Sequence, residues 1–294
     1  MAFAQRIINL TFQLGEGDFG KSGQNSVKLE GLRCSVFIDK AGSIGNQNCE
    51  LRVWGMPLEL MNRLTVLNKL AYPQQVYNSV IVEAGDEQSG TAVAFIGNIQ
   101  EAWADGRNPP DVMFHVLAIT ALTDMIKPIP PTSYKGSVDI AIALAGIAQQ
   151  MNLTLENGGV TGQISNPYWP GSLGAQLRTM CKSIDCEYII DETERVLAVW
   201  PKGKARAGAT VRLASDSGMV GYPAFTQNGV RLTSLYNPNL AYGKVVTVES
   251  EFSAAQGQWQ VAKVTHALDA GVPGGEWFTE IECGLLGQGL PIID

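Results

Sequence analysis

Histidine is almost absent from this chain: only two of its 294 residues are histidine, His115 and His266. They lie too far apart in the sequence for the short ligand spacings that bind zinc, such as HExxH. Each sits in an apolar, strand-like run, where a packed or hydrogen-bonded histidine is more common than a reactive one. We therefore predict no metal site and a structural role for both histidines.

The sequence also lacks the motifs that carry nucleophiles and phosphate groups. It has no GxSxG nucleophile elbow, no GxxxxGK[ST] loop and no GxGxxG after a strand. Acidic residues gather in DETER at 191–195 and in VEAGDEQ at 82–88, which are typical of hairpin tips. A carboxylate pair for glycoside cleavage would need a partly apolar pocket, which such tips seldom provide. We predict no catalytic residue, no cofactor and no enzymatic activity.

Long apolar runs are missing as well, because no stretch approaches the roughly 18 residues that a membrane helix needs. The N-terminal run MAFAQRIINLTFQLGEG alternates and has no small-residue cleavage site, so we expect no signal peptide. The five cysteines are odd in number and widely spaced, which argues against a disulfide framework. We expect folding in a cytoplasm, with the cysteines as small buried residues.

Charged residues make up only 17% of the chain, and the net charge is -7. Lysine and arginine are scattered, which argues against specific nucleic-acid binding. The one small basic cluster is Lys202, Lys204 and Arg206, and we interpret it as a solvated linker. Few charges together with many amides favour a surface that neighbouring molecules cover.

Alternating strands dominate what is present. Residues 6–14 place one apolar and one polar row on opposite faces, and similar runs continue to about residue 125, with one helix after Pro57. The Pro-rich segment 127–137 is predicted to be a linker. Two helix-then-strand units follow, with Ser137 and Ser172 as predicted helix caps. After a second linker from 201, strands and turns return.

The predicted fold class is therefore α+β, mainly β. We assign residues 1–126 to an N-terminal β domain, which the alternation allows to be a barrel or a sandwich. Residues 127–203 form a small α/β domain, and residues 204–294 form a C-terminal β domain.

Aromatic residues stand beside turns in the C-terminal part, as in GYPAFTQNGVRLTSLYNPNL at 221–240. Tyrosine and tryptophan at strand ends often anchor protein interfaces, although they also close the ends of barrels. We nominate six candidate interface residues: Tyr222, Leu235, Tyr236, Asn237, Pro238 and Trp277.

The C-terminal stretch resembles the baseplate hub proteins of contractile-tailed bacteriophages over about 70 residues. The matching features are Gly221-Tyr222-Pro223, Asn228-Gly229, Leu235 to Pro238, Gly243, Trp259, His266 to Asp269, Pro273 to Trp277 and Cys283. The N-terminal run GTAVAFIGNIQEAWADGRNPPDVMFHVLA is more loosely similar to the strand pair of hub and tail-tube proteins.

The resemblance implies two tail-tube-like β-barrel domains flanking the small α/β domain, the second borrowing a strand from about 114–126. It further implies a homotrimeric ring with pseudo-sixfold symmetry that joins the hexameric tail tube to the trimeric central spike, with tape-measure and wedge proteins as further partners. The location would be the tail baseplate of a virion, assembled in the host cytoplasm. DNA would pass through an acidic lumen without being bound, and the net charge is compatible with that.

Two alternatives stay open at this stage. One is the hub of a related contractile injection system. The other is a carbohydrate-binding tail or adhesin module that uses Trp169, Trp200 and Trp277.

Overall fold

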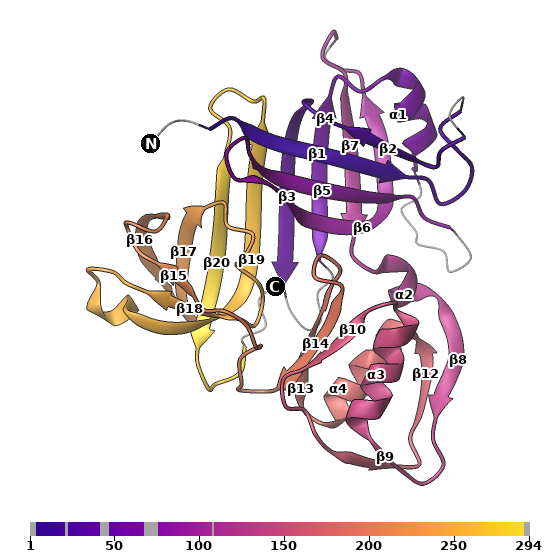
Figure 1. Ribbon diagram of the computed structural model, residues 1–294, viewed down its shortest axis with the longest axis vertical. Helices are drawn as coiled ribbons and strands as arrows, with labels where there is room; N and C mark the ends of the chain where they lie inside the picture. Colours follow the sequence, from indigo (N-terminus) through magenta and orange to yellow (C-terminus); the bar gives the residue numbers. More distant parts are fainter. Residues whose placement is uncertain (1–3, 21–22, 42–46, 68–75, 108, 291–294) are drawn as a thin grey trace. The chain divides into compact units, whose positions relative to one another are not determined.

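The computed structural model describes residues 4–20, 23–41, 47–67, 76–107 and 109–290 (Figure 1). Its contacts divide the chain into two compact units. Unit 1 comprises Met1–Asp39, Gln47–Thr123 and His266–Phe278, and unit 2 comprises Lys40–Asn46, Asp124–Thr265 and Thr279–Asp294. The predicted mainly-β character is confirmed, whereas the division into three domains stays a prediction.

Unit 1 is built around an antiparallel sheet with the order β19-β3-β4-β7-β6-β5-β1-β2. The resemblance implied that the C-terminal barrel borrows a strand from about 114–126. Residues 113–119 form β7, which lies between β4 and β6 in the sheet. The elements are β1 Arg6–Gln13, β2 Ser26–Leu29, β3 Arg33–Ala41, β4 Asn48–Trp54, α1 Leu58–Leu64, β5 Ser79–Asp86, β6 Gly90–Asp105 and β7 Met113–Ile119, with the end of β19 Gly257–Ala270 and the start of β20 Trp277–Leu285.

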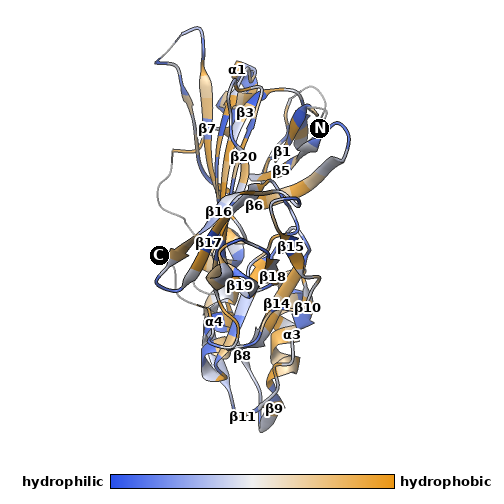
Figure 2. Ribbon diagram, turned by 90° about the vertical axis from the view of Figure 1, so that its left-hand side faces the viewer, coloured by the Kyte–Doolittle hydropathy of each residue, from blue (hydrophilic) through white to orange (hydrophobic). Residues whose placement is uncertain are grey.

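Alternation explains why these segments form strands. In β1 the apolar row Ile8, Leu10 and Phe12 is buried, because successive side chains of a strand point to opposite faces. The register carries the same row across the sheet, where Cys34 pairs with Val53 and Val53 with Phe114, all fully buried. In Figure 2, β3 and β7 are coloured by residue hydropathy, and both carry hydrophilic as well as hydrophobic residues.

The helical part of unit 2 consists of short strands and two helices. The hairpin β13–β14 is joined by β10, which runs parallel to β14. The elements are α2 Leu122–Ile126, which begins in unit 1, β8 Pro128–Ser133, β9 Ser137–Asp139, α3 Ile140–Gln150, β10 Thr154–Asn157, β11 Gln163–Ser165, β12 Tyr168–Ser172, α4 Leu173–Ser183, β13 Cys186–Asp191 and β14 Val196–Pro201.

Two local predictions in this region are wrong. The expected linker at 127–137 contains β8, which pairs with β12. Its prolines are tolerated because β8 pairs on one side only within the described residues, and an edge strand does not need every N–H. The cap of α3 is Asp139, which accepts the N–H of Ala141 at 2.8 Å, and not Ser137. The predicted cap Ser172 is confirmed, since it accepts the N–H of Ala175.

The rest of unit 2 consists of strands. Four strands follow one another in the order β16-β17-β20-β19. In addition, β18 pairs with β19, and β15 pairs with β18. The core between them includes the buried residues Val230, Leu232, Val246 and Val261. The elements are β15 Val211–Leu213, β16 Met219–Thr226, β17 Gly229–Leu235, β18 Val245–Val248 and the 3-10 helix η1 Ser253–Ala255, with the remaining parts of β19 and β20.

Candidate assembly interface

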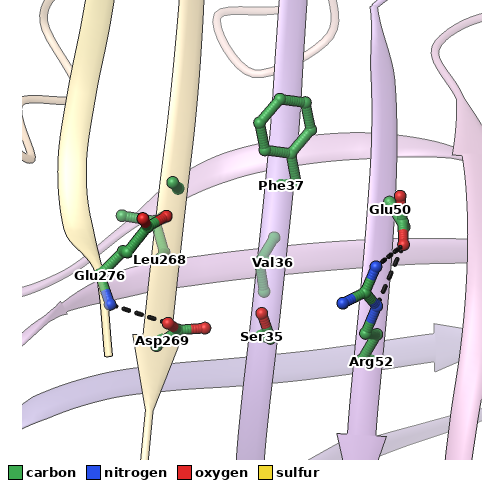
Figure 3. A pocket seen from close by; sticks show the side chains of 9 residues that line it. Ser35, Val36, Phe37, Glu50, Arg52, Leu268, Asp269 and Glu276 are labelled. Carbon is green, nitrogen blue, oxygen red and sulfur yellow. Dashed lines mark hydrogen bonds and ion pairs between the residues drawn. The ribbon is translucent and has the colours of Figure 1, made fainter. Parts of the chain in front are cut away.

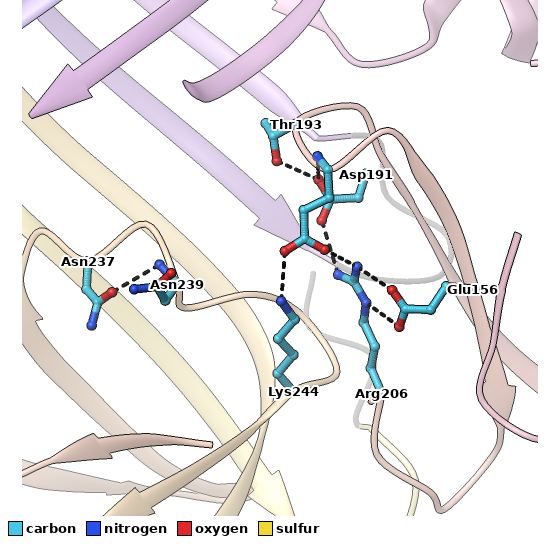
Figure 4. A network of polar contacts seen from close by, with 8 residues as sticks. Glu156, Asp191, Thr193, Arg206, Asn237, Asn239 and Lys244 are labelled. Atoms are coloured by element: carbon cyan, nitrogen blue, oxygen red, sulfur yellow. Dashed lines mark hydrogen bonds and ion pairs between the residues drawn. The ribbon is translucent and has the colours of Figure 1, made fainter. Parts of the chain in front are cut away.

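Arg206 is the centre of a buried ion network in unit 2 (Figure 4). Its Nε lies 3.1 Å from Oε1 of Glu156, and its Nη1 lies 3.1 Å from Oδ2 of Asp191. Its Nη2 donates to Glu156 and Glu194, and Lys244 Nζ approaches Glu194 at 2.8 Å. The prediction of a solvated basic linker is therefore wrong at Arg206, because three carboxylates offset the cost of removing its charge from water.

The same network explains the acidic hairpin tip at 191–195. Burial raises the pKa of Asp191, but the hydrogen bond from Thr193 and the charges of Lys40 and Arg206 outweigh it, so the pKa lies below its usual value. Asp191 and Glu194 thus hold cations within the fold. They do not form the open pair that glycoside cleavage would need.

Two candidate interface residues are exposed on unit 2. Tyr222 of β16 is 60% exposed, its hydroxyl lies 3.3 Å from Glu251, and its ring lies 5.1 Å from that of Phe252. Leu235, the last residue of β17, is 47% exposed. Their exposure agrees with the predicted interface.

The next three candidates are held in a structured turn. Tyr236 is half-buried, and burial raises the pKa of its hydroxyl to about 12. The Asn237 N–H donates to Thr279, and its side chain accepts the Asn239 N–H at 3.0 Å. Pro238 is exposed between them.

Trp277 lies in unit 1, at the start of β20. The guanidinium of Arg6 lies 5.6 Å from its ring centroid and donates to the carbonyl of Gly275 at 2.8 Å. The Asp269 N–H donates to the carbonyl of Glu276 at 2.8 Å, and the Asp269 side chain accepts the Glu276 N–H at 2.8 Å. Trp277 is half-buried and held by the Pro-Gly-Gly turn.

The strongest candidate for an interface on unit 2 is the edge formed by β16. Within the described residues β16 pairs only with β17, and the register shifts between Val220 and Ala224. Val220, Tyr222 and Phe225 on this strand are all exposed, as are Leu235 and Phe252 nearby. Exposed apolar residues beside an open strand edge are typical of a surface that another chain covers.

Unit 1 carries a second surface, which the sequence-based candidates missed. On the second face of its sheet, Arg52 of β4 lies opposite His115 of β7 in the strand register. The His115 ring stacks on that of Trp103 of β6, with the ring centroids 4.9 Å apart. Burial and the Arg52 charge both lower the pKa of His115. A neighbouring pocket of about 320 Å³ is lined by exposed Phe37 and by Arg52, which is ion-paired with Glu50 (Figure 3).

A sequence signal for this face existed. Strand β7, MFHVLAI, is apolar on both rows, and Met113, Leu117 and Ile119 of the second row are half-buried. A strand without polar alternation indicates two covered faces. In the described part of the chain this second face stays half-exposed, which makes it a second candidate interface.

The described residues contain no group of three or more histidine, cysteine or acidic residues arranged to hold a metal ion. None of the helices in this part of the chain has the length and apolar character that a membrane crossing requires.

The fold is similar to solved tail proteins. A tail protein from Neisseria meningitidis superposes with a TM-score of 0.63 at 10% identity, over 96% of this chain and 98% of that one. The 43 kDa tail protein of prophage MuSo2 from Shewanella oneidensis gives 0.61 at 10% identity, over 99% and 100%. The E. coli c3393 protein, a type VI secretion system component, gives 0.58 at 7% identity, over 90% and 77%.

Sequence comparison gives the family. No curated protein sequence matches the chain significantly. In contrast, the family model described as Baseplate hub gp41 matches residues 7–271, which is most of the chain. The chain belongs to the Baseplate hub gp41 family.

Proposed function

We propose that this protein is the structural hub of a phage tail baseplate. Three copies form a ring with pseudo-sixfold symmetry, in which two tube-like β-barrel domains per chain flank the small α/β domain. The ring joins the hexameric tail tube to the trimeric central spike. The family match over residues 7–271 carries this proposal, and the mainly-β fold supports it.

The two candidate surfaces suit such a ring. In a closed ring each subunit offers different surfaces to its two neighbours. The β16 edge of unit 2 and the second sheet face of unit 1 differ in shape and chemistry, one being a strand edge and the other an aromatic and arginine-bearing face. We assign at least one of them to the contact between copies.

In this role the protein is not an enzyme and needs no cofactor. Its partners are the tail tube protein and the central spike, with tape-measure and wedge proteins in contact beyond them, and its location is the virion baseplate. A net charge of -7 per chain is compatible with a lumen that repels passing DNA.

A second candidate is the hub of a related contractile injection system. It is favoured by the similarity to the type VI secretion protein and to a chain of the Francisella PdpA-VgrG complex, with a TM-score of 0.59 at 9% identity over 99% of this chain and 59% of that one. The carbohydrate-binding alternative is less well supported, because Trp169 and Trp200 are buried and cannot contact a glycan.

Light-scattering mass of the purified chain over a range of concentrations tests the proposal. A particle of three times 31.6 kDa supports it, and a stable dimer contradicts it. If the chain is monomeric, the spike protein is added, and failure to form a trimeric complex with it also contradicts the proposal. Binding to the tube and spike of a phage, compared with those of a secretion system, separates the two candidates.

A further inference from the structure

A pocket of about 650 Å³ opens beside the β16 edge. We call it the acidic aromatic pocket, and it is lined chiefly by Arg212, Asp216, Met219, Tyr222, Glu249 and Glu251. Met219 packs against the buried core of unit 2 and gives the pocket an apolar wall that the fold holds in place. Tyr222 forms another wall and is itself supported by the ring of Phe252.

Among the described residues, Arg212 is the one cation that lines this pocket, and it already forms two ion pairs. Arg212 Nε lies 2.8 Å from Glu249, and its Nη1 lies 2.8 Å from Asp216. These bonds lower the pKa of both carboxyl groups, so both stay charged at neutral pH. Because Arg212 is held between two carboxylates, it attracts no external anion, and the pocket keeps an excess of negative charge.

Glu251 adds a further negative charge to the pocket. It accepts the Tyr222 hydroxyl at 3.3 Å, and among the described residues no lysine or arginine forms an ion pair with it. A cation placed here would face a carboxylate and the adjoining ring of Tyr222. Carboxylates and aromatic ring faces both attract ammonium and guanidinium groups.

We infer that the acidic aromatic pocket receives a lysine or arginine side chain from an extended segment of a partner protein, whose neighbouring apolar residues cover the exposed side chains of β16. Charge complementarity selects this occupant over an anionic or purely apolar one. The inference rests on the proposed function, because it gives the chemistry of one of the hub's contacts. It concerns a contact with another protein and not the contact between copies.

A peptide titration tests the pocket without reference to oligomeric state. The probe is a short, acetylated and amidated peptide with one arginine between valines, and the matched control peptide carries neutral citrulline in place of arginine. Binding to the full chain is followed by calorimetry and by the NMR shift of the Met219 methyl group. Glu251→Gln and Tyr222→Ser are compared with Asp185→Asn, which removes an exposed carboxylate outside the pocket.

We expect the arginine peptide to bind and to shift the Met219 signal, and its affinity to fall with added salt. Glu251→Gln should weaken binding roughly fivefold, as expected for an exposed ion pair, and Asp185→Asn should not change it. Equal binding of the citrulline peptide, or unchanged binding to Glu251→Gln, would overturn the inference.

Absence of peptide binding would overturn it as well. If Glu251→Gln then weakened self-association, the pocket would belong to the contact between copies. If the peptide does not bind, the measurement of trimer mass still tests the hub proposal. If no trimer forms, the peptide titration still tests the pocket, so each proposal can be contradicted independently of the other.

Discussion

The guanidinium of Arg206 lies 3.1 Å from the carboxylate of Asp191, and the two side chains are 0% and 7% exposed. Such a pair is costly to form, because both charges leave water, and more costly to break, because one charge then stays buried alone. The segment after β14 is thereby fixed to the tip of the β13–β14 hairpin by charge as well as by packing.

Removing the cation from this pair should destabilise the protein strongly. We expect Arg206→Leu to lower the free energy of unfolding by about 3–5 kcal/mol, since Asp191 loses its buried partner. Arg231→Leu is the control, because Arg231 is about half exposed and pairs with Glu282 at the surface, where a change of about 0–1 kcal/mol is expected. Urea unfolding of both variants makes the comparison, and equal losses would contradict the buried role.

Stability should fall in acid in part through Asp191. Its folded-state pKa lies below the unfolded value of about 3.9, so its contribution is present above that pH and is lost as the pH falls through the folded-state pKa. Asp191→Asn should be less stable than the wild type at pH 7, and the gap should narrow below about pH 4. A gap that stays constant between pH 7 and pH 3 would show that this carboxylate does not titrate as described.

Gly243 should tolerate no side chain. Its φ is +81°, and a Cβ would lie 2.5 Å from the indole of Trp200. We expect Gly243→Ala to cost about 2–4 kcal/mol, from backbone strain and displacement of a buried ring. Gly287→Ala is the matched control, with φ +86° and open space around the Cβ, for which strain alone predicts about 1–2 kcal/mol. Melting temperatures that fall equally would exclude the clash.

Leu235 and Tyr236 should separate assembly from folding. Leu235→Ser removes an exposed side chain, so unfolding should change by less than about 0.5 kcal/mol, while assembly with a partner protein at the β16 edge should weaken. Tyr236→Ser removes a half-buried ring and should cost about 2 kcal/mol of stability. Denaturant unfolding measures the change in stability, and light scattering of mixtures with the tube or spike protein measures assembly. A folding defect in Leu235→Ser would place this side chain in the core.

Local patterns predicted the strands well. The alternation in β1 and the polar turn between β5 and β6 appear in the structure as expected. The signal works there because one buried row and one exposed row lie within a single strand. It also predicted the order of strands, helices and strands along the chain.

Long-range pairing explains what the sequence did not predict. Glu156 lies 50 residues from its partner Arg206, so the local basic run gave no sign of a buried charge. The prolines of β8 indicated a linker, because nothing local reveals that β12 will pair with them. Tyr236 follows an exposed leucine, and the packing that covers it comes from tertiary contacts. Assembly surfaces are the hardest case, because their partners lie outside the chain.

The course of β19 and β20 affects how this protein is made. His266–Phe278 belongs to unit 1, where β19 is the neighbour of β3. During synthesis, β3 therefore lacks its neighbour β19 until the ribosome has translated most of unit 2. An unpaired strand edge can pair with other chains, which leads to aggregation. We expect a chain that ends before residue 266 to aggregate, so that expression of the N-terminal unit alone fails even though most of its strands are present.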